Sequence, residues 1–239
     1  MMRKYFGVDS PIMNFLSRIT DFIVLNILTL VLCIPIVTGG AALTALYYVM
    51  GRMVRGDSYY VFKTYFSSFK SNFKQATCEW LMVLGAAVLL FFDISLLSYN
   101  DTGFPRLFVY LLIAIALILF ILLQFLFPIQ SRFENPVKKT IHNTIMLAMA
   151  NFPRAILMAL FWTIPVILVL ISLRLIPIAF FFGLAVPAYL KALLFVPVFK
   201  RFEPEQEEVR DDYLFEMDEN DPAFDILAGH DAGTDENDV

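Results

Sequence analysis

Two stretches of this sequence, residues 107–129 and 155–172, contain no charged side chain and are almost entirely apolar. Each reaches the roughly 18 residues at which an apolar helix can cross the hydrocarbon core of a bilayer. Over the whole chain 59% of residues are hydrophobic and 17% are charged, whereas soluble domains have about a quarter of their residues charged. The sequence therefore predicts an all-α integral membrane protein and excludes an ordinary soluble domain.

Six apolar segments are candidates for membrane-spanning helices. They are residues 15–36, 41–54, 77–97, 107–129, 155–173 and 177–199. The second segment is short, because a helix over residues 41–54 rises only about 21 Å against a hydrocarbon core of roughly 30 Å. Two arrangements are therefore open: six spans, or five spans with a short re-entrant helix.

The placement of basic residues favours six spans. If all six segments cross and the N-terminus lies inside, only Arg106 and Arg174 among the loop cations fall outside. Omitting the second span moves Arg3, Lys4 and Arg18 to the outer side, which opposes the positive-inside rule. We predict a polytopic helix bundle in the cytoplasmic membrane with both termini in the cytoplasm.

The C-terminal part of the chain differs sharply in charge from the rest. Residues 1–202 contain 17 Lys and Arg against 7 Asp and Glu, while residues 203–239 contain 1 against 15. A segment with few large apolar residues and such a charge excess cannot bury enough surface to fold. The sequence predicts a transmembrane domain over 1–202 and an acidic, largely disordered cytoplasmic tail over 203–239.

A repeated pattern at the span ends suggests three helical hairpins in one orientation. Asn-Phe pairs at residues 14, 72 and 151 precede the outward spans. The returning spans end in a helix-breaking Gly or Pro followed by an Arg and an acidic residue two positions apart. These candidate membrane-boundary pairs are Arg55 and Asp57, Arg132 and Glu134, and Arg201 and Glu203. Each pair is equally consistent with an ordinary interface signal that involves no repeat.

Three charged residues inside the predicted spans form the candidate functional cluster. Lys191 lies ten residues before Arg201, which places its amine deep in the bilayer and calls for a partner. Asp21 and Glu79 lie in the same half of the bilayer and are the candidate counter-charges. The cluster is interpreted as a structural ion pair, with a substrate or proton site as the alternative.

Signatures of catalysis and of cofactor or metal binding are missing from the sequence. It lacks the GxxxxGK[ST], HExxH and GxSxG motifs, and it has only two histidines. Cys33 and Cys78 show no metal-ligand spacing, and the basic residues are dispersed along membrane boundaries rather than gathered in a groove. We expect no enzyme activity, cofactor, bound metal or nucleic-acid partner.

Residues 34–48 read Ile-Pro-Ile-Val-Thr-Gly-Gly-Ala-Ala-Leu-Thr-Ala-Leu-Tyr-Tyr, and the pattern Phe66-x-x-Phe69-Lys70-x-Asn72-Phe73 follows. With these motifs the chain resembles, over about residues 5–203, the YesL-like family of bacterial membrane proteins, a domain of unknown function. The resemblance implies a setting beside carbohydrate-uptake transporters and glycan-degrading enzymes in Gram-positive bacteria. It implies no catalytic or binding residues.

Two functions are consistent with the sequence. The first is an accessory or regulatory component of carbohydrate uptake in the bacterial cytoplasmic membrane, with a sugar-transporter or sensor subunit as its partner. The family setting, the acidic tail and two basic amphipathic stretches, residues 59–71 and 137–150, favour it. The alternative is a small-solute transporter that uses the charged cluster and proline-broken helices.

Overall fold

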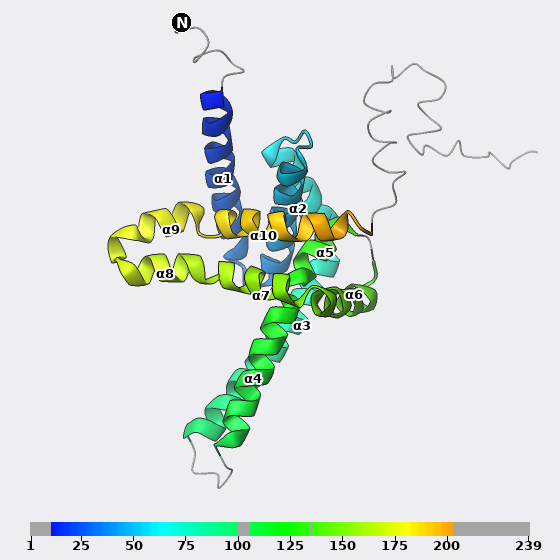
Figure 1. The fold of residues 1–239 in the computed structure, drawn as a ribbon, viewed down its shortest axis with the longest axis vertical. Coiled ribbons are helices and arrows are strands. Elements are labelled where there is room, and N and C mark those ends of the chain that lie inside the picture. The colour runs from blue at the N-terminus through cyan, green and yellow to red at the C-terminus, as the bar shows by residue number, and fades with distance from the viewer. Residues whose placement is uncertain (1–10, 100–105, 134, 203–239) are drawn as a thin grey trace, which may run out of the picture. The chain divides into compact units, whose positions relative to one another are not determined.

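The computed structural model describes residues 11–99, 106–133 and 135–202, and within these ranges every regular element is a helix (Figure 1). The predicted all-α class is thereby confirmed. The α-helices are α1 (Pro11–Cys33), α2 (Gly39–Arg55), α3 (Val61–Tyr99), α4 (Leu107–Leu122), α5 (Leu126–Arg132), α6 (Val137–Ala150), α7 (Phe152–Phe161), α8 (Thr163–Ile171), α9 (Ile176–Phe182) and α10 (Ala185–Phe199). Short 3-10 helices are η2 (Ile36–Thr38), η3 (Leu123–Phe125) and η4 (Leu173–Leu175).

The chain divides into two compact units, Met1–Val196 and Pro197–Val239. In the second unit the described residues are 197–202, which finish α10 and form a turn. The predicted acidic tail, 203–239, lies outside the described residues.

Four helical segments are long and apolar enough to cross a membrane, and a bent pair provides a fifth. The four are Leu16–Cys33, Val61–Ser98, Arg106–Arg132 and Phe152–Ile171, and the bent pair is Leu173–Phe182 with Ala185–Phe199, which meet at 53°. The membrane character of the chain agrees with the sequence prediction. The second predicted span, residues 41–54, is not among these segments, so the six-span count is not confirmed.

Residues 41–54 form most of α2, which is packed among other helices instead of facing outward. Its small residues Ala41, Ala42 and Ala45 are fully buried. A Cβ atom on Gly40 would lie 2.4 Å from the carbonyl oxygen of Ala76 in α3. Small residues thus bring the α2 and α3 backbones into contact, as is common where membrane helices cross.

α3 runs for 39 residues without interruption. The sequence predicts a basic amphipathic stretch over residues 59–71 and a separate span over 77–97. The segment contains no proline, however, and its one glycine, Gly85, is tolerated within the helix. The second amphipathic stretch does form a separate helix, α6, because Pro136 precedes it and Pro153 follows it. An amphipathic pattern alone therefore does not distinguish a separate helix at the membrane surface from the end of a long membrane-spanning helix.

Prolines determine where three apolar segments break. η3 interrupts the apolar segment 107–129 just before Pro128, α7 gives way to α8 at Trp162 just before Pro165, and α9 ends before Pro187. A proline lacks the N–H that would bond to the carbonyl four residues earlier, and its ring crowds that carbonyl. Each break therefore leaves backbone groups that need new partners in an apolar setting.

Asn26 of α1 supplies those partners at the break between α9 and α10. Its Oδ1 accepts hydrogen bonds from the N–H groups of Leu184 (2.7 Å) and Ala185 (2.9 Å), and its Nδ2 donates to the carbonyl oxygen of Phe180 (2.6 Å). In an unbroken helix the N–H of Leu184 would bond to that same carbonyl. The fully buried Asn26 amide takes the place of one helical hydrogen bond and holds the bend to α1.

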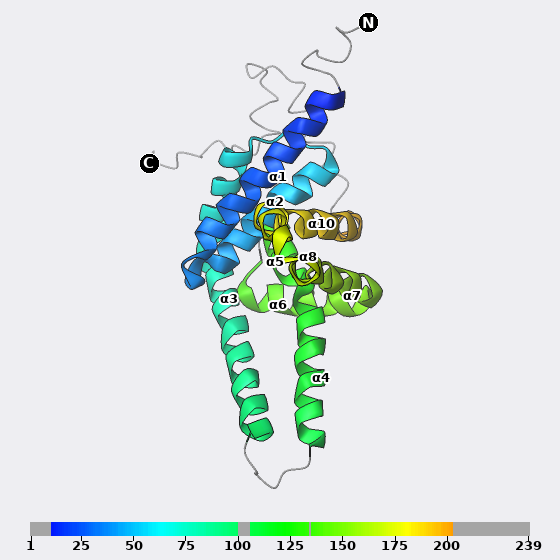
Figure 2. The same cartoon turned by 90° about the vertical axis from the view of Figure 1, so that its left-hand side faces the viewer.

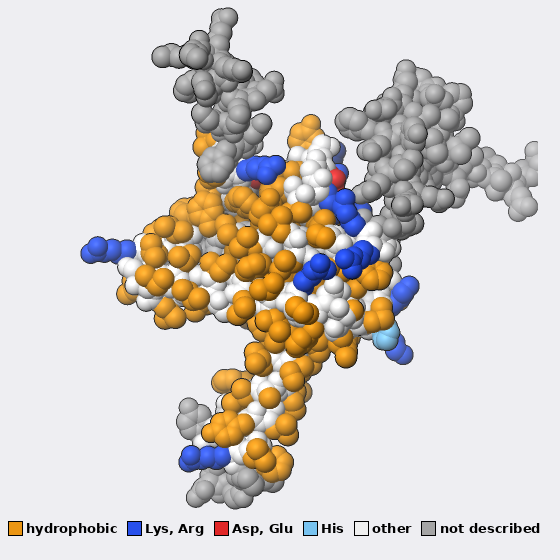
Figure 3. Space-filling model, viewed as in Figure 1, with side chains coloured by type: hydrophobic (Ala, Val, Ile, Leu, Met, Phe, Trp, Pro, Cys, Tyr) orange, Lys and Arg blue, Asp and Glu red, His pale blue; other side chains and the backbone are white. Residues whose placement is uncertain are grey.

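The hairpins do not share one direction. α3 and α4 lie side by side, and apolar residues cover much of their exposed surface (Figure 3). α8 and α9 also form a pair, but they run crosswise to α3 and α4 (Figures 1 and 2). The predicted arrangement of three parallel hairpins is therefore not confirmed.

Candidate functional site

Lys191 is fully buried in α10 and is held by uncharged groups. Its Nζ donates hydrogen bonds to Oε1 of Gln124 (2.7 Å) and to the hydroxyl of Tyr47 (3.2 Å). The amine also lies 4.4 Å from the ring centroid of Trp162, which is a cation–π contact. These contacts with an amide, a phenol and an aromatic ring occupy the amine where the sequence predicts a carboxylate partner.

The two predicted counter-charges bind elsewhere. Asp21 accepts a hydrogen bond from the hydroxyl of Tyr59 (2.8 Å), just before α3. Glu79 is buried in α3 and accepts a hydrogen bond from Nε2 of Gln75 (3.2 Å). The structure therefore does not bring Lys191, Asp21 and Glu79 together as bonded partners. Helical spacing gives the depth of each residue but not the direction in which it faces, so the pairing was not determined by the sequence.

Tyr59 lies outside the membrane-spanning segments. Burial, and then the hydrogen bond to the Asp21 carboxylate, raise the pKa of the Tyr59 phenol above its ordinary value. This contact joins α1 to the segment between α2 and α3.

One of the three predicted boundary pairs can be described in full. Arg55 and Asp57 form an ion pair with Nη2 and Oδ2 2.9 Å apart, at the end of α2. Gly56 between them adopts a left-handed conformation with φ of 84°, which ends the helix. Arg132 ends α5 and Arg201 follows α10, while Glu134 and Glu203 lie outside the described residues.

A polar pocket, not anticipated from the sequence, lies between α3, α5 and the segment that follows α5. It has a volume of about 620 Å³, within the range of small-molecule sites. Hydroxyl and amide side chains dominate its lining. The lining residues are Tyr48, Ser67, Ser68, Ser71, Asn72, Gln75, Gln130, Ser131, Arg132, Phe133, Asn135 and Pro136.

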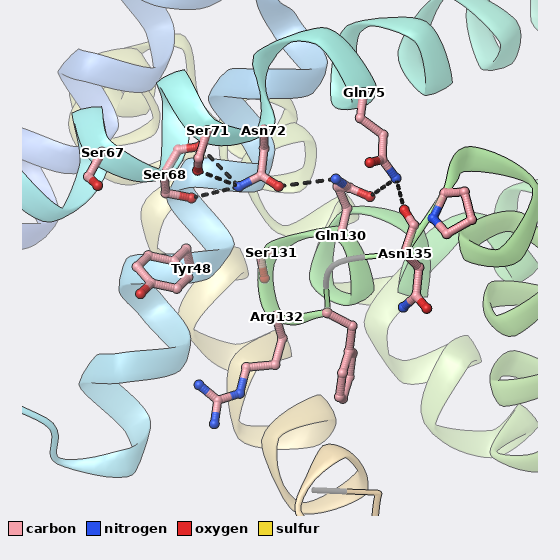
Figure 4. Close-up of a pocket in the computed structure, with 12 residues that line it drawn as sticks. Tyr48, Ser67, Ser68, Ser71, Asn72, Gln75, Gln130, Ser131, Arg132 and Asn135 are labelled. Carbon is pink, nitrogen blue, oxygen red and sulfur yellow. Dashed lines mark hydrogen bonds between the residues drawn. The ribbon is translucent and has the colours of Figure 1, made fainter. Parts of the chain in front are cut away.

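A chain of amides holds the pocket walls together (Figure 4). Oδ1 of Asn72 accepts from Nε2 of Gln130 (3.1 Å), and Oε1 of Gln130 accepts from Nε2 of Gln75 (2.8 Å). Nε2 of Gln75 also donates to the backbone oxygen of Asn135. The sequence signal for this site is a row of uncharged polar residues at helical spacing in α3, which faces Gln130 of a segment that is otherwise apolar.

The pocket combines groups that recognise polar, uncharged molecules. Its hydroxyls and amides both donate and accept hydrogen bonds, Tyr48 and Phe133 add aromatic surface, and Arg132 adds one cation. No group of three His, Cys, Asp or Glu residues is placed to hold a metal ion in the part of the chain that the structure describes. Neither Lys191, Asp21 nor Glu79 lines the pocket.

Residues 22–94 match the family model described as Protein of unknown function, DUF624. YesL-like proteins carry this domain, so the match confirms the resemblance seen in the sequence. The matched region contains Asn26, all of α2 and the α3 wall of the pocket, whereas Gln130 and Lys191 lie beyond it. No curated protein and no solved structure matches the chain.

Proposed function

We propose, from the premise that residues 22–94 carry the YesL-like domain, that this membrane protein is a non-enzymatic accessory or regulatory component of carbohydrate uptake. The observation that carries the proposal is the packing around Lys191. A transporter that used this amine would need water or solute to reach it, yet the amine is fully buried against Gln124, Tyr47 and Trp162. A buried amine that is bonded to its neighbours favours a scaffold or a sensor.

The pocket supports a sensory role. A lining of hydroxyls and amides with two aromatic rings suits a small polyhydroxylated ligand of about monosaccharide size, and 620 Å³ accommodates one. The YesL-like setting beside sugar transporters agrees with this class of ligand. Binding there would report the solute to a partner subunit.

The proposed location is the bacterial cytoplasmic membrane, with six passes and both termini in the cytoplasm. The 17 residues of α2 correspond to about 26 Å of helix, and α2 is largely buried among other helices. A helix in that position needs no long lipid-facing surface, so a short sixth pass is compatible with its sequence. The many Lys and Arg residues on the proposed inner side support this orientation.

Affinity purification in mild detergent from the native host, grown on glycans, tests the role. We expect a sugar-transporter or sensor subunit to co-purify in stoichiometric amount. Exchanging Lys138 and Lys139 of α6 for glutamate is expected to weaken this association. Arg174→Glu, on the proposed outer side, serves as the matched control. Recovery of the protein alone from the wild-type strain would contradict the proposal.

A small-solute transporter is the second candidate, and the bend between α9 and α10 favours it, since broken helices build many transporter sites. It predicts uptake of a labelled sugar into liposomes that contain only this protein. Flux that Lys191→Met abolishes while the protein stays folded would replace the accessory function with transport.

A further inference from the structure

Gln75 is surrounded by more oxygen atoms than its amide can bond. Its Nε2 lies 3.2 Å from Oε1 of Glu79, 2.8 Å from Oε1 of Gln130 and 3.2 Å from Oγ1 of Thr140, and it also bonds to the backbone oxygen of Asn135. An amide nitrogen carries two hydrogens, so it satisfies two of these four oxygens at once. The Thr140 hydroxyl lies 3.4 Å from Oε1 of Gln130 and from the backbone oxygen of Asn135 and adds one further hydrogen. Four oxygens, one of them from a carboxylate, thus converge on a single amide nitrogen.

Two further oxygens in this region lack partners. Oε2 of Glu79 and Oγ1 of Thr144 make no hydrogen bond with the described residues, and both side chains are only 1% exposed. Thr144 follows Thr140 by one turn on the same face of α6. A buried carboxylate with an open oxygen is costly in free energy unless a cation or a donor compensates it.

We propose that this cage of oxygens binds a sodium ion. Its ligands are a carboxylate, an amide oxygen, a backbone carbonyl and a threonine hydroxyl, which are the hard oxygen donors that alkali and alkaline-earth cations take. One carboxylate balances one monovalent charge, so the occupied site is neutral, whereas Ca²⁺ would leave a buried positive charge. The sequence prediction of no bound metal considered only histidine and cysteine spacing and did not consider this kind of site.

The ion sits close to the present position of Nε2 of Gln75, and the Gln75 side chain withdraws and turns so that its amide oxygen faces the ion. Four oxygens from α3, α5, the segment after α5 and α6 already converge on that point from positions up to 65 residues away from Gln75. Gln75, Gln130 and Asn135 also line the polar pocket, so the pocket gives the ion its path from water. The site joins four segments and does not depend on the proposed regulatory function.

Binding of ²²Na⁺ to the full-length purified protein in nanodiscs tests the site. We expect saturable binding that unlabelled NaCl competes away and choline chloride does not. We also expect Tm to rise with the logarithm of the sodium concentration at constant ionic strength and pH. Absence of saturable ²²Na⁺ binding to the wild-type protein overturns the proposal. So does an equal rise of Tm on acidification without sodium, with no ²²Na⁺ bound, because Glu79 would then hold a proton.

Variants locate the ion. Glu79→Gln and Thr140→Val are each expected to weaken ²²Na⁺ binding at least tenfold. Asp93→Asn removes an exposed carboxylate farther along α3 and is expected to leave binding unchanged. Equal loss in the Asp93 variant, or full binding in a folded Glu79 variant, places the ion elsewhere and refutes the assignment.

Discussion

Replacing Asn26 with leucine removes the side chain that completes the break between α9 and α10. Leucine has the same number of side-chain heavy atoms and the same branching as asparagine but can neither donate nor accept a hydrogen bond. The N–H groups of Leu184 and Ala185 and the carbonyl of Phe180 then lose their described side-chain partner. The helix cannot straighten to pair them, because Pro187 crowds the carbonyl of Gly183.

The expected loss follows from the number of bonds. Interhelical side-chain hydrogen bonds in membrane proteins average about 0.6 kcal/mol and reach about 1.7 kcal/mol, so three bonds amount to about 2–5 kcal/mol. For a chain of this size each kcal/mol corresponds to about 2–4 °C in Tm, so Asn26→Leu should lower Tm by at least about 4 °C. Thermal unfolding of the purified protein in detergent measures this change.

Thr44→Val is the matched control for the loss of a buried polar group. The hydroxyl of the fully buried Thr44 donates only to the carbonyl of Gly40, within the same helix, so no backbone group loses its sole partner. We expect this variant to change Tm by less than about 2 °C. If Asn26→Leu changes Tm no more than Thr44→Val does, the assigned role of Asn26 at the helix break is refuted.

Three further predictions concern other parts of the fold. Gly40→Ala should lower the free energy of unfolding by about 2 kcal/mol or more, because the added methyl group clashes with the α3 backbone. Gly85→Ala, where the added methyl group meets open space, should raise the free energy of unfolding by about 0.5–1 kcal/mol. Equal unfolding midpoints of the two variants in detergent would contradict the α2–α3 packing. Lys191→Met should cost about 1–3 kcal/mol because its buried amide and phenol partners lose their donor, and an unchanged Tm would show that they do not need it. The pKa of Tyr59 is raised in the folded protein, so its contribution to stability is complete below pH of about 10 and declines as pH rises further. Tyr59→Phe should therefore lessen the loss of Tm between about pH 10 and 11, and parallel profiles for the two proteins would contradict this.

Much of the secondary structure follows from the sequence, because its causes are local. Apolar length predicts the helices, and Pro128, Pro165 and Pro187 mark the three breaks that interrupt them. The continuous α3 was missed for a related reason: its amphipathic start and apolar remainder look like two elements, although no residue between them breaks a helix.

Contacts between segments that are far apart in the chain could not be predicted from the sequence in this way. The depth of Lys191 in its helix indicated that its amine needs a partner, and opposite charge pointed to Asp21 or Glu79. In the structure the amine bonds instead to the uncharged Gln124, from another apolar segment. The pocket is assembled from uncharged residues between positions 48 and 136, none of which stands out individually. Only the packing of α3 against α5 makes Gln75 and Gln130 a site.

Because α3 is one unbroken helix, it can transmit a tilt at one end to its other end as a rigid body. Its pocket residues lie near one end, and Gln75 is separated from Tyr99 by about 36 Å of helix, more than the roughly 30 Å of a bilayer core. Proline hinges divide several other apolar segments, but α3 has none that could absorb a rotation. A tilt of about 5° imposed at the pocket therefore displaces the far end by about 3 Å, which carries a movement on one side of the membrane to the other.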